Sequence, residues 1–354
     1  MKTTLRSFPL ARWTPDAHGT RAAEFLREGR AHELGGCITE ALQCYTAAVE
    51  AAERASERAV VAESLRRSAI VHHQRNQPAL ARQLCERSHR IALDLKDAVL
   101  AAEALNALAG FDLESGAMQA AREKFQQALA LGGASPDLRG RTEQNLGILA
   151  NVQGDAGEAM ARYRQSLEAF ESIGDERGCA IAYHNLGMLS ADGGQWDDAD
   201  RYFNRCLGAA RTIGDIHLEA LALLNQAEVY LAREQYEQAR HNAEMALGVF
   251  DQLGSQLDKA DVYRVIGRAY RETGRYPLAE SRLKNAMELA VDTGSVLTEA
   301  EVAREMGLLY QEMGRRGEAL AYLNVARTLF GRLDARVDLA DVSTRIQQLE
   351  EMDQ

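Results

Sequence analysis

Three asparagines stand 40 residues apart in the middle of the chain, and their side chains are suited to hydrogen bonding rather than to catalysis. They are Asn145, Asn185 and Asn225. Each amide offers two N–H donors and one carbonyl acceptor, so three amides in line could bond the main chain of an extended peptide. The spacing alone shows only that the three positions align. The alternative is that each amide bonds a neighbouring helix.

The residues around these asparagines form a mixed polar and apolar surface. Gln144 and His184 each directly precede an asparagine, and Met188 follows Asn185 by three residues. An amide, an imidazole and a thioether can contact both the polar main chain and the apolar side chains of a partner. We therefore expect these residues to line the same binding surface as the asparagines.

Arginines near the C-terminal end form a second group of candidates. Arg264 and Arg268 share one helix face, and Arg304 repeats the position of Arg264 one interval later. Guanidinium groups bind carboxylates, so this group favours a partner that carries acidic groups or a free C-terminus. The alternative is ion pairing with carboxylates of the chain itself, such as Asp261 and Glu301. A similar patch at the other end would come from Arg27, Arg30, Arg66 and Arg67.

Patterns that carry catalysis or bind metals and cofactors do not stand out. The sequence has no Gly-Lys-Ser/Thr phosphate loop, no His-Glu-x-x-His and no Gly-x-Ser-x-Gly. His72 and His73 are adjacent, so their rings would point about 100° apart on a helix. The five cysteines are odd in number and include no Cys-x-x-Cys pair, which favours small buried residues in a reducing compartment. We expect no enzyme activity, no metal and no cofactor.

An internal repeat must position the candidate residues. Eight alanines recur at intervals of 40 residues, with one interval of 38: Ala41, Ala81, Ala121, Ala159, Ala199, Ala239, Ala279 and Ala319. Twelve residues before each alanine stands Gly or Ala, and five residues before it stands Gly in six of eight repeats. Small residues let two antiparallel helices cross closely, and the glycine between them permits a left-handed turn.

The repeats also end alike. Gly174, Gly214, Gly254 and Gly294 are each followed by Asp or Ser, at Asp175, Asp215, Ser255 and Ser295. This pair predicts that the glycine ends one helix and that the Asp or Ser side chain caps the next. Each repeat is therefore expected to read helix A, turn, helix B, turn.

This pattern resembles the tetratricopeptide repeat over roughly residues 21–330. The Leu-Gly-x2-Tyr and Ala-x3-Phe signatures appear as Leu186-Gly187, Ile266-Gly267-x2-Tyr270, Ala121-x3-Phe125 and Ala199-x3-Phe203. The period of 40 residues exceeds the usual period of about 34, so we expect longer helices or turns. The usual closing proline is absent. Repeats of this length are similar to those of kinesin light chains, G-protein-signalling modulators and Rap-type regulators.

The resemblance implies an all-α fold: a right-handed superhelical solenoid of about eight helical hairpins plus a C-terminal capping helix. In such solenoids helix A lies on the concave side, and in several families an asparagine at this position holds the main chain of a bound peptide. We expect the solenoid over residues 21–331 and the capping helix and tail over residues 332–354. Residues 1–20 would be an N-terminal extension, for which disorder is one option.

Composition and charge narrow the partners. The net charge of −11 would repel a phosphate backbone, and no run of 18 apolar residues predicts a membrane span. The N-terminus lacks the apolar core of a secretory signal, so we expect a cytoplasmic location. The leading hypothesis is a non-catalytic scaffold that binds a protein or peptide in the concave groove. The alternative is a peptide-switched signalling regulator that acts on a response regulator or transcription factor. The oligomeric state stays open.

Overall fold

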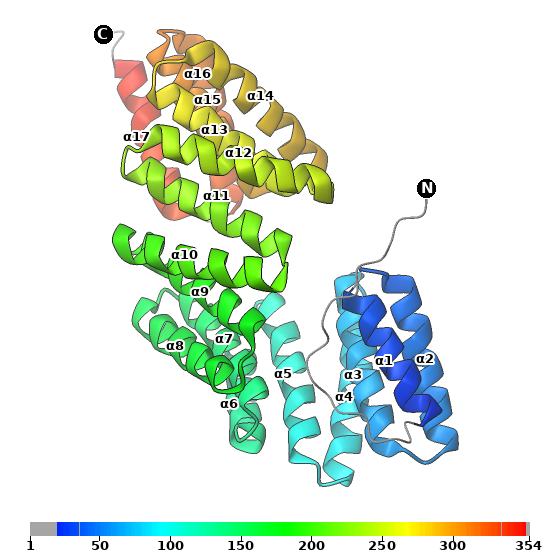
Figure 1. Cartoon of the computed structure of the whole chain (residues 1–354). Helices are drawn as coiled ribbons and strands as arrows, with labels where there is room; N and C mark the ends of the chain where they lie inside the picture. The colour runs from blue at the N-terminus through cyan, green and yellow to red at the C-terminus, as the bar shows by residue number, and fades with distance from the viewer. Residues whose placement is uncertain (1–19, 35, 334, 352–354) are drawn as a thin grey trace, which may run out of the picture. The chain divides into compact units, whose positions relative to one another are not determined.

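The structure is a computed structural model that describes residues 20–34, 36–333 and 335–351. All regular elements in these residues are α-helices, seventeen in number, joined by short turns (Figure 1). Apart from Thr20, the expected N-terminal extension lies outside the described residues, as do the last three residues of the expected tail. The chain divides into two compact units between Gly154 and Asp155.

The helices of the first unit pair as hairpins along the chain. Its seven helices are α1 (Arg21–Leu34), α2 (Ile38–Arg54), α3 (Arg58–Gln74), α4 (Pro78–Asp94), α5 (Ala98–Glu114), α6 (Met118–Gly132) and α7 (Pro136–Val152). The odd-numbered helices are the A helices, and each contacts the next A helix of the unit. The even-numbered helices are the B helices, and each packs on its own A helix and on the following one.

The second unit follows the same plan. Its ten helices are α8 (Ala156–Ile173), α9 (Glu176–Asp192), α10 (Trp196–Ile213), α11 (Ile216–Ala232), α12 (Tyr236–Leu253), α13 (Gln256–Glu272), α14 (Tyr276–Thr293), α15 (Val296–Glu312), α16 (Arg316–Arg332) and α17 (Arg336–Glu351). The A helices α9, α11, α13 and α15 contact one another in sequence, and α17 packs on α16. On α17, Val342, Ile346 and Leu349 are buried.

The two helices of a hairpin approach closely where the small residues recur. All eight alanines of the repeat are fully buried. A Cβ added to Gly187 would lie 2.7 Å from Cε1 of Phe203, and one added to Gly267 would lie 2.6 Å from Cγ of Leu283. These contacts are too short for real atoms, so a glycine is required at these two crossings, whereas Ala109 fits beside Phe125 in the third repeat. The expected close crossing is therefore confirmed, and the repeated hairpins of an all-α fold with it.

The turn between helices A and B has the left-handed backbone that the glycines predict. The eight positions have φ between 57° and 81°: Gly36, Asn76, Gly116, Gly154, Gly194, Glu234, Gly274 and Gly314. Asn tolerates this conformation better than most residues, whereas Glu does not. The left-handed conformation is therefore kept at this position of the repeat even where the residue is Glu234, which disfavours it.

The turn between repeats matches the capping prediction at three of four positions. Asp175 and Asp215 accept hydrogen bonds from the main-chain N–H groups of Gly178 and Leu218, both at 3.1 Å, and Ser295 also caps its helix. The prediction is wrong for Ser255, whose hydroxyl donates to the carboxylate of Asp258 instead. A carboxylate three residues on competes with the main chain for this hydroxyl.

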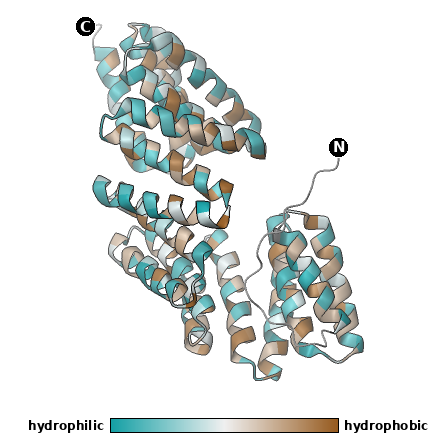
Figure 2. Cartoon of the chain, in the orientation of Figure 1, coloured by the Kyte–Doolittle hydropathy of each residue, from teal (hydrophilic) through white to brown (hydrophobic). Residues whose placement is uncertain are grey.

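Hydrophilic and hydrophobic residues are interspersed along the helices of both units (Figure 2). Among the described residues, no helix combines the length and the apolarity that a bilayer crossing would require.

Replacing the strained turn residue Glu234 by glycine should stabilise the protein. A non-glycine residue in the left-handed conformation costs about 1–2 kcal/mol. Glycine avoids this cost but loses more chain entropy on folding, so Glu234→Gly should raise the free energy of unfolding by about 0.5–1 kcal/mol. The midpoint of urea unfolding measures this gain. Glu288→Gly, at an exposed helical position of α14, should lose about 1 kcal/mol. Equal losses in both variants would contradict the strain argument.

Adding one methyl group at the hairpin crossing should destabilise it. Gly187→Ala forces Cβ into the ring of Phe203, whereas Gly248→Ala on α12 meets nothing within 4 Å. Both variants gain about 0.5–1 kcal/mol of helix propensity, so the difference in their unfolding midpoints reports the overpacking cost, about 1–3 kcal/mol. Two equally stabilised variants would show that the helices can move apart freely.

Candidate functional site

The candidate residues lie on one face of the A helices. We call this the A-helix face: the residues two and three before, and one after, the recurring small Gly or Ala of each A helix. In the second unit it includes Asn185 and Met188 on α9 and Asn225 on α11. Asn145 and Gln144 occupy the same positions on α7 of the first unit. These side chains are half-buried except that of Met188, which is exposed.

Two of the three asparagines bond a neighbouring A helix. In the first unit, Nδ2 of Asn145 donates to Oδ1 of Asn106 on α5, at 3.5 Å. In the second unit, Nδ2 of Asn225 donates to Nε2 of His184 on α9, at 2.8 Å. Nδ2 of Asn185 is different, because it is buried and has no hydrogen-bond partner within the described residues. The alternative of a bond to a neighbouring helix therefore holds for Asn145 and Asn225, and peptide binding stays a prediction.

His184 is held neutral beside these amides. Burial lowers its pKa, and the adjacent Asn185 amide acts in the opposite direction. The ring packs edge-on against Phe203, with 6.0 Å between ring centroids. A neutral imidazole can accept the hydrogen bond from Asn225. Around Asn185 and Asn225 the A-helix face thus presents uncharged polar side chains and the apolar Met188, whereas Glu228 on α11 carries a charge.

The arginines of α13 and α15 are paired with carboxylates of other A helices and of α17. Arg264 lies 2.7 Å from Glu228 on α11 and 3.2 Å from Glu301 on α15. Arg304 lies 2.6 Å from Asp338 on α17. The pair of Arg268 with Glu228 is much looser, at 3.9 Å.

The arginines around Glu228 lower its pKa. Burial alone would raise this pKa, but Arg264 and Arg268 outweigh burial and lower it below the ordinary value. Glu228 is therefore held as a carboxylate between the two guanidinium groups, whose charge it offsets within the chain.

Arg271 is the centre of the densest ion-pair cluster. Its guanidinium donates to Glu305 at 3.2 Å, to Glu272 at 2.7 Å and to Glu312 at a shorter distance. The side chains of Arg271 and Glu305 are only 6% and 4% exposed, so this pair is part of the buried structure. The three carboxylates lie on α13 and α15.

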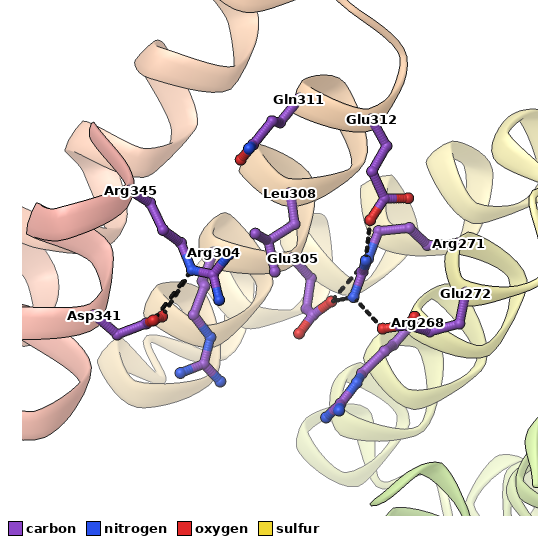
Figure 3. A pocket seen from close by; sticks show the side chains of 10 residues that line it. All are labelled: Arg268, Arg271, Glu272, Arg304, Glu305, Leu308, Gln311, Glu312, Asp341 and Arg345. Carbon is purple, nitrogen blue, oxygen red and sulfur yellow. Dashed lines mark hydrogen bonds and ion pairs between the residues drawn. The ribbon is translucent and has the colours of Figure 1, made fainter. Parts of the chain in front are cut away.

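A cavity of about 370 Å³ opens beside this cluster, between α13, α15 and α17 (Figure 3). Its lining residues are Arg268, Arg271, Glu272, Arg304, Glu305, Leu308, Gln311, Glu312, Asp341 and Arg345. Only Arg268 and Arg304 among them were predicted as site residues. The cavity lies wholly in the second unit.

The first unit has a comparable ion-pair network on its A helices. Arg66 on α3, with a side chain only 5% exposed, pairs with Glu63 at 2.7 Å and with Glu103 on α5 at 3.2 Å. Arg141 on α7 also pairs with Glu103. Burial would raise the pKa of Glu103, but Arg66 and Arg141 lower it. The basic patch predicted from Arg27, Arg30, Arg66 and Arg67 therefore includes one arginine, Arg66, whose charge is neutralised by carboxylates of the chain itself.

The sequence separation of the partners could have identified these ion pairs. Partners on successive A helices are separated by 34–41 residues, as in Arg264–Glu228 at 36 and Arg271–Glu305 at 34. This separation is one repeat plus or minus about one or two helical turns. Searching for opposite charges at this separation would have shown that the arginines are matched. The cavity itself gives no signal in the sequence.

The described residues contain no group of three His, Cys, Asp or Glu side chains arranged to hold a metal ion.

Asp261 on α13 makes the stability depend on pH in a predictable direction. Burial raises its pKa to about 6 although Arg264 opposes the shift, and Glu301 adds a smaller increase; the pKa in an unfolded chain is about 3.9. Folding therefore favours the protonated form, so stability is lost as the pH rises from about 4 through about 6. Asp261→Asn should be more stable than the wild type at pH 7.5, by up to about 3 kcal/mol. Urea midpoints at pH 4 and pH 7.5 test this; a gap that is as large at pH 4 would contradict it.

Comparison with known proteins agrees with this architecture. The family described as tetratricopeptide repeat matches residues 138–212, 178–252, 218–292 and 258–332, which together span more than half of the chain. The matches begin 40 residues apart, as the alanines do. A search of curated protein sequences finds no match.

Several solved structures share the fold. A STAND protein with a tetratricopeptide repeat sensor, PH0952 from Pyrococcus horikoshii, aligns with a TM-score of 0.69 and 17% identity over 92% of this chain and 50% of that one. A Rap protein complexed with Competence and Sporulation Factor aligns with a TM-score of 0.61 and 12% identity, over 94% and 98%. BtubC (BKLC) from P. vanneervenii aligns with a TM-score of 0.54 and 20% identity, over 62% and 92%.

At these identities the structural likeness describes the fold alone, and this chain spans half the length of PH0952. The family follows from the sequence match and from the repeated hairpins with small residues at their crossings. The chain belongs to the tetratricopeptide repeat family.

Proposed function

We propose that this chain is a non-catalytic protein-interaction scaffold, in which the A-helix face of α9 and α11 binds a peptide segment of a partner protein. The observation that carries the proposal is Nδ2 of Asn185, a buried donor without a partner in the described part of the chain. Leaving such a donor unmatched costs about 1–3 kcal/mol. A main-chain carbonyl of a bound peptide would remove that cost.

The surroundings of Asn185 support a peptide as the ligand. Asn225 and His184 form a neutral hydrogen-bonded pair next to it, and the side chain of Met188 is 37% exposed. A few placed polar groups among apolar side chains are typical of ligand sites. Methionine adapts its shape to different partners at low cost. The face therefore suits main-chain recognition combined with one apolar contact.

The charges of the chain bear on the kind of partner that it would bind. The net charge of −11 supports a protein partner over a nucleic acid. Arg264, Arg268 and Arg304 favoured an acidic partner, but each faces a carboxylate of its own chain. The proposal therefore assigns no acidic group to the partner. A cytoplasmic location remains part of the proposal.

Removing two amides from the face should weaken peptide binding. Peptides are first selected from a random display library on the full-length wild-type chain, and their affinities are measured by fluorescence anisotropy. Asn185→Ala with Asn225→Ala should remove the bond of Asn185 to the peptide and the Asn225–His184 pair beside it, each worth about 0.5–1.5 kcal/mol, so affinity should fall by about 5- to 150-fold.

The matched control removes two amides elsewhere. Gln238 and Gln252 are exposed on α12, a B helix of the same unit. Gln238→Ala with Gln252→Ala should bind the selected peptides as the wild type does. If the control weakens binding and the asparagine variant does not, the peptide binds on the opposite layer and the proposal fails.

A second candidate function is a regulator switched by a bound peptide, as the similarity to Rap-type repeats implies. The observation that favours it is the nearly complete alignment with the Rap protein, over 94% of this chain and 98% of that one. Small-angle scattering of the full chain with and without a selected peptide separates the two candidates. A switch should change the scattering profile on binding, whereas a static scaffold should keep it.

A further inference from the structure

Exposed apolar side chains gather at the turns that join one repeat to the next. Among the described residues, twelve of the eighteen large apolar side chains that are exposed lie within three residues of a turn between repeats, whereas three lie as close to a turn within a repeat. Single exposed apolar residues need no explanation, but a contiguous group of them is typical of an interaction surface. The edge formed by the turns between repeats is therefore the more apolar one.

Two neighbouring turns of the second unit carry the most exposed side chains of this edge. We call them the terminal turn pair: the first turn joins α14 to α15, and the second joins α16 to α17. Both α15 and α17 pack on α16, and the inward side chains Val296 and Leu339 pack against one hydrophobic cluster. The outward side chains are 41% to 83% exposed: Val291 and Leu297 in the first turn, Leu333 and Val337 in the second.

Asp292 and Arg332 place opposite charges at equivalent positions of the two turns. They are one repeat of 40 residues apart, as are Leu297 and Val337. Both charged side chains are exposed, and neither forms an ion pair within the described residues. The equivalent residues of the first two repeats, Arg54 and Asp94, do pair within the chain, with Glu50 and Arg58. The terminal turn pair thus presents one unpaired charge of each sign beside its apolar side chains.

The other charges of the two turns agree with this difference in sign. Glu299 is a second acidic residue of the first turn, and Arg336 is a second basic residue of the second turn. Asp338 is engaged by Arg304 at 2.6 Å. Asp334 lies outside the described residues, and counting its negative charge still leaves the second turn positive. The first turn is therefore acidic and the second is basic.

We propose that the terminal turn pair binds the terminal turn pair of a second copy of this chain, so that the protein forms a twofold-symmetric dimer. A twofold contact needs a surface that is complementary to itself. An axis that passes between the two turns brings the first turn of each copy opposite the second turn of the other. Asp292 then faces Arg332 of the second copy and Leu297 faces Val337, and each contact occurs twice.

The charges of the terminal turn pair favour this occupant and this arrangement. An axis through the first turn would set Asp292 against its own copy, where like charges repel. Anionic lipids would be repelled by the first turn and by the net charge of −11. The outer face of α17 is no alternative contact, because its exposed residues are polar: Asp341, Thr344, Gln347 and Gln348. A helix of another protein becomes an outcome of the test.

Sedimentation velocity of the untagged full-length chain tests the proposal. The contact is small, so we expect a dimer with a Kd on the order of 10–100 µM, measured between about 1 and 300 µM protein at about 0.15 M salt. The association should end at the dimer, because a twofold contact is closed and leaves no free copy of the same surface.

Carboxylates placed in the contact should prevent the dimer. Leu297→Glu with Val337→Glu should raise the Kd more than about tenfold, because like charges would then meet across an apolar contact. The matched control is Leu93→Glu with Val99→Glu, the same charge change at a turn between repeats of the first unit, where the two side chains are 52% and 45% exposed. The control should keep the Kd of the wild type.

A charge swap tests the arrangement of the two copies. Asp292→Arg alone sets two arginines against each other, and Arg332→Asp alone sets two aspartates against each other. Each single variant should raise the Kd by about 3- to 10-fold. The variant that carries both changes restores opposite charges across the contact and should recover most of the affinity. Far-ultraviolet circular dichroism and the unfolding midpoint check that each variant is folded.

Three results would overturn the inference. The first is a chain that stays monomeric over the whole concentration range, which would leave the apolar turns to a different protein. The second is a dimer that the Leu297 and Val337 variant and its control weaken equally. The third is a double charge swap that binds no better than the single variants. None of these results affects the proposed function, which depends on peptide binding at α9 and α11.

Discussion

The close approach of the two helices in each hairpin is the constraint on which the rest of the structure depends. A glycine such as Gly187 faces the ring of Phe203 with no room for a Cβ. At the same position Ala227 packs in one cluster with the small Ala243, and Ala109 in one cluster with the bulky Phe125. Because a small residue recurs at this position of every A helix, successive A helices of a unit contact one another, and their outward side chains become neighbours.

This register explains why charges on the A helices pair with each other. A side chain on one A helix lies beside a side chain of the next, about one or two turns away, so Arg264 reaches both Glu228 and Glu301. Such pairs are half-buried, and breaking one partner would leave the other charge poorly solvated. They hold α11, α13 and α15 together while keeping the face polar.

Two of the polar groups that are left without partners lie on A helices of the second unit. Nδ2 of Asn185 and Oε1 of Gln311 are buried and unmatched within the described residues, although buried polar groups in folded proteins are nearly always hydrogen-bonded. Local rules are most often broken at functional positions. The region around Asn185, with the hydrogen-bonded Asn225 and His184 beside it, is the part that we propose to bind a main chain.

The sequence by itself determined the all-α repeat, the hairpins and their left-handed turns, including the turns at Asn76 and Glu234. These features depend on residues within one repeat, where chain connectivity fixes which atoms can meet. It placed Asn145, Asn185 and Asn225 at equivalent positions, but only the tertiary structure decided that Asn225 bonds His184 while Asn185 keeps an unmatched donor. It also decided that Arg264 and Arg304 are neutralised. These outcomes depend on residues more than thirty positions apart, which come into contact only after the hairpins have packed.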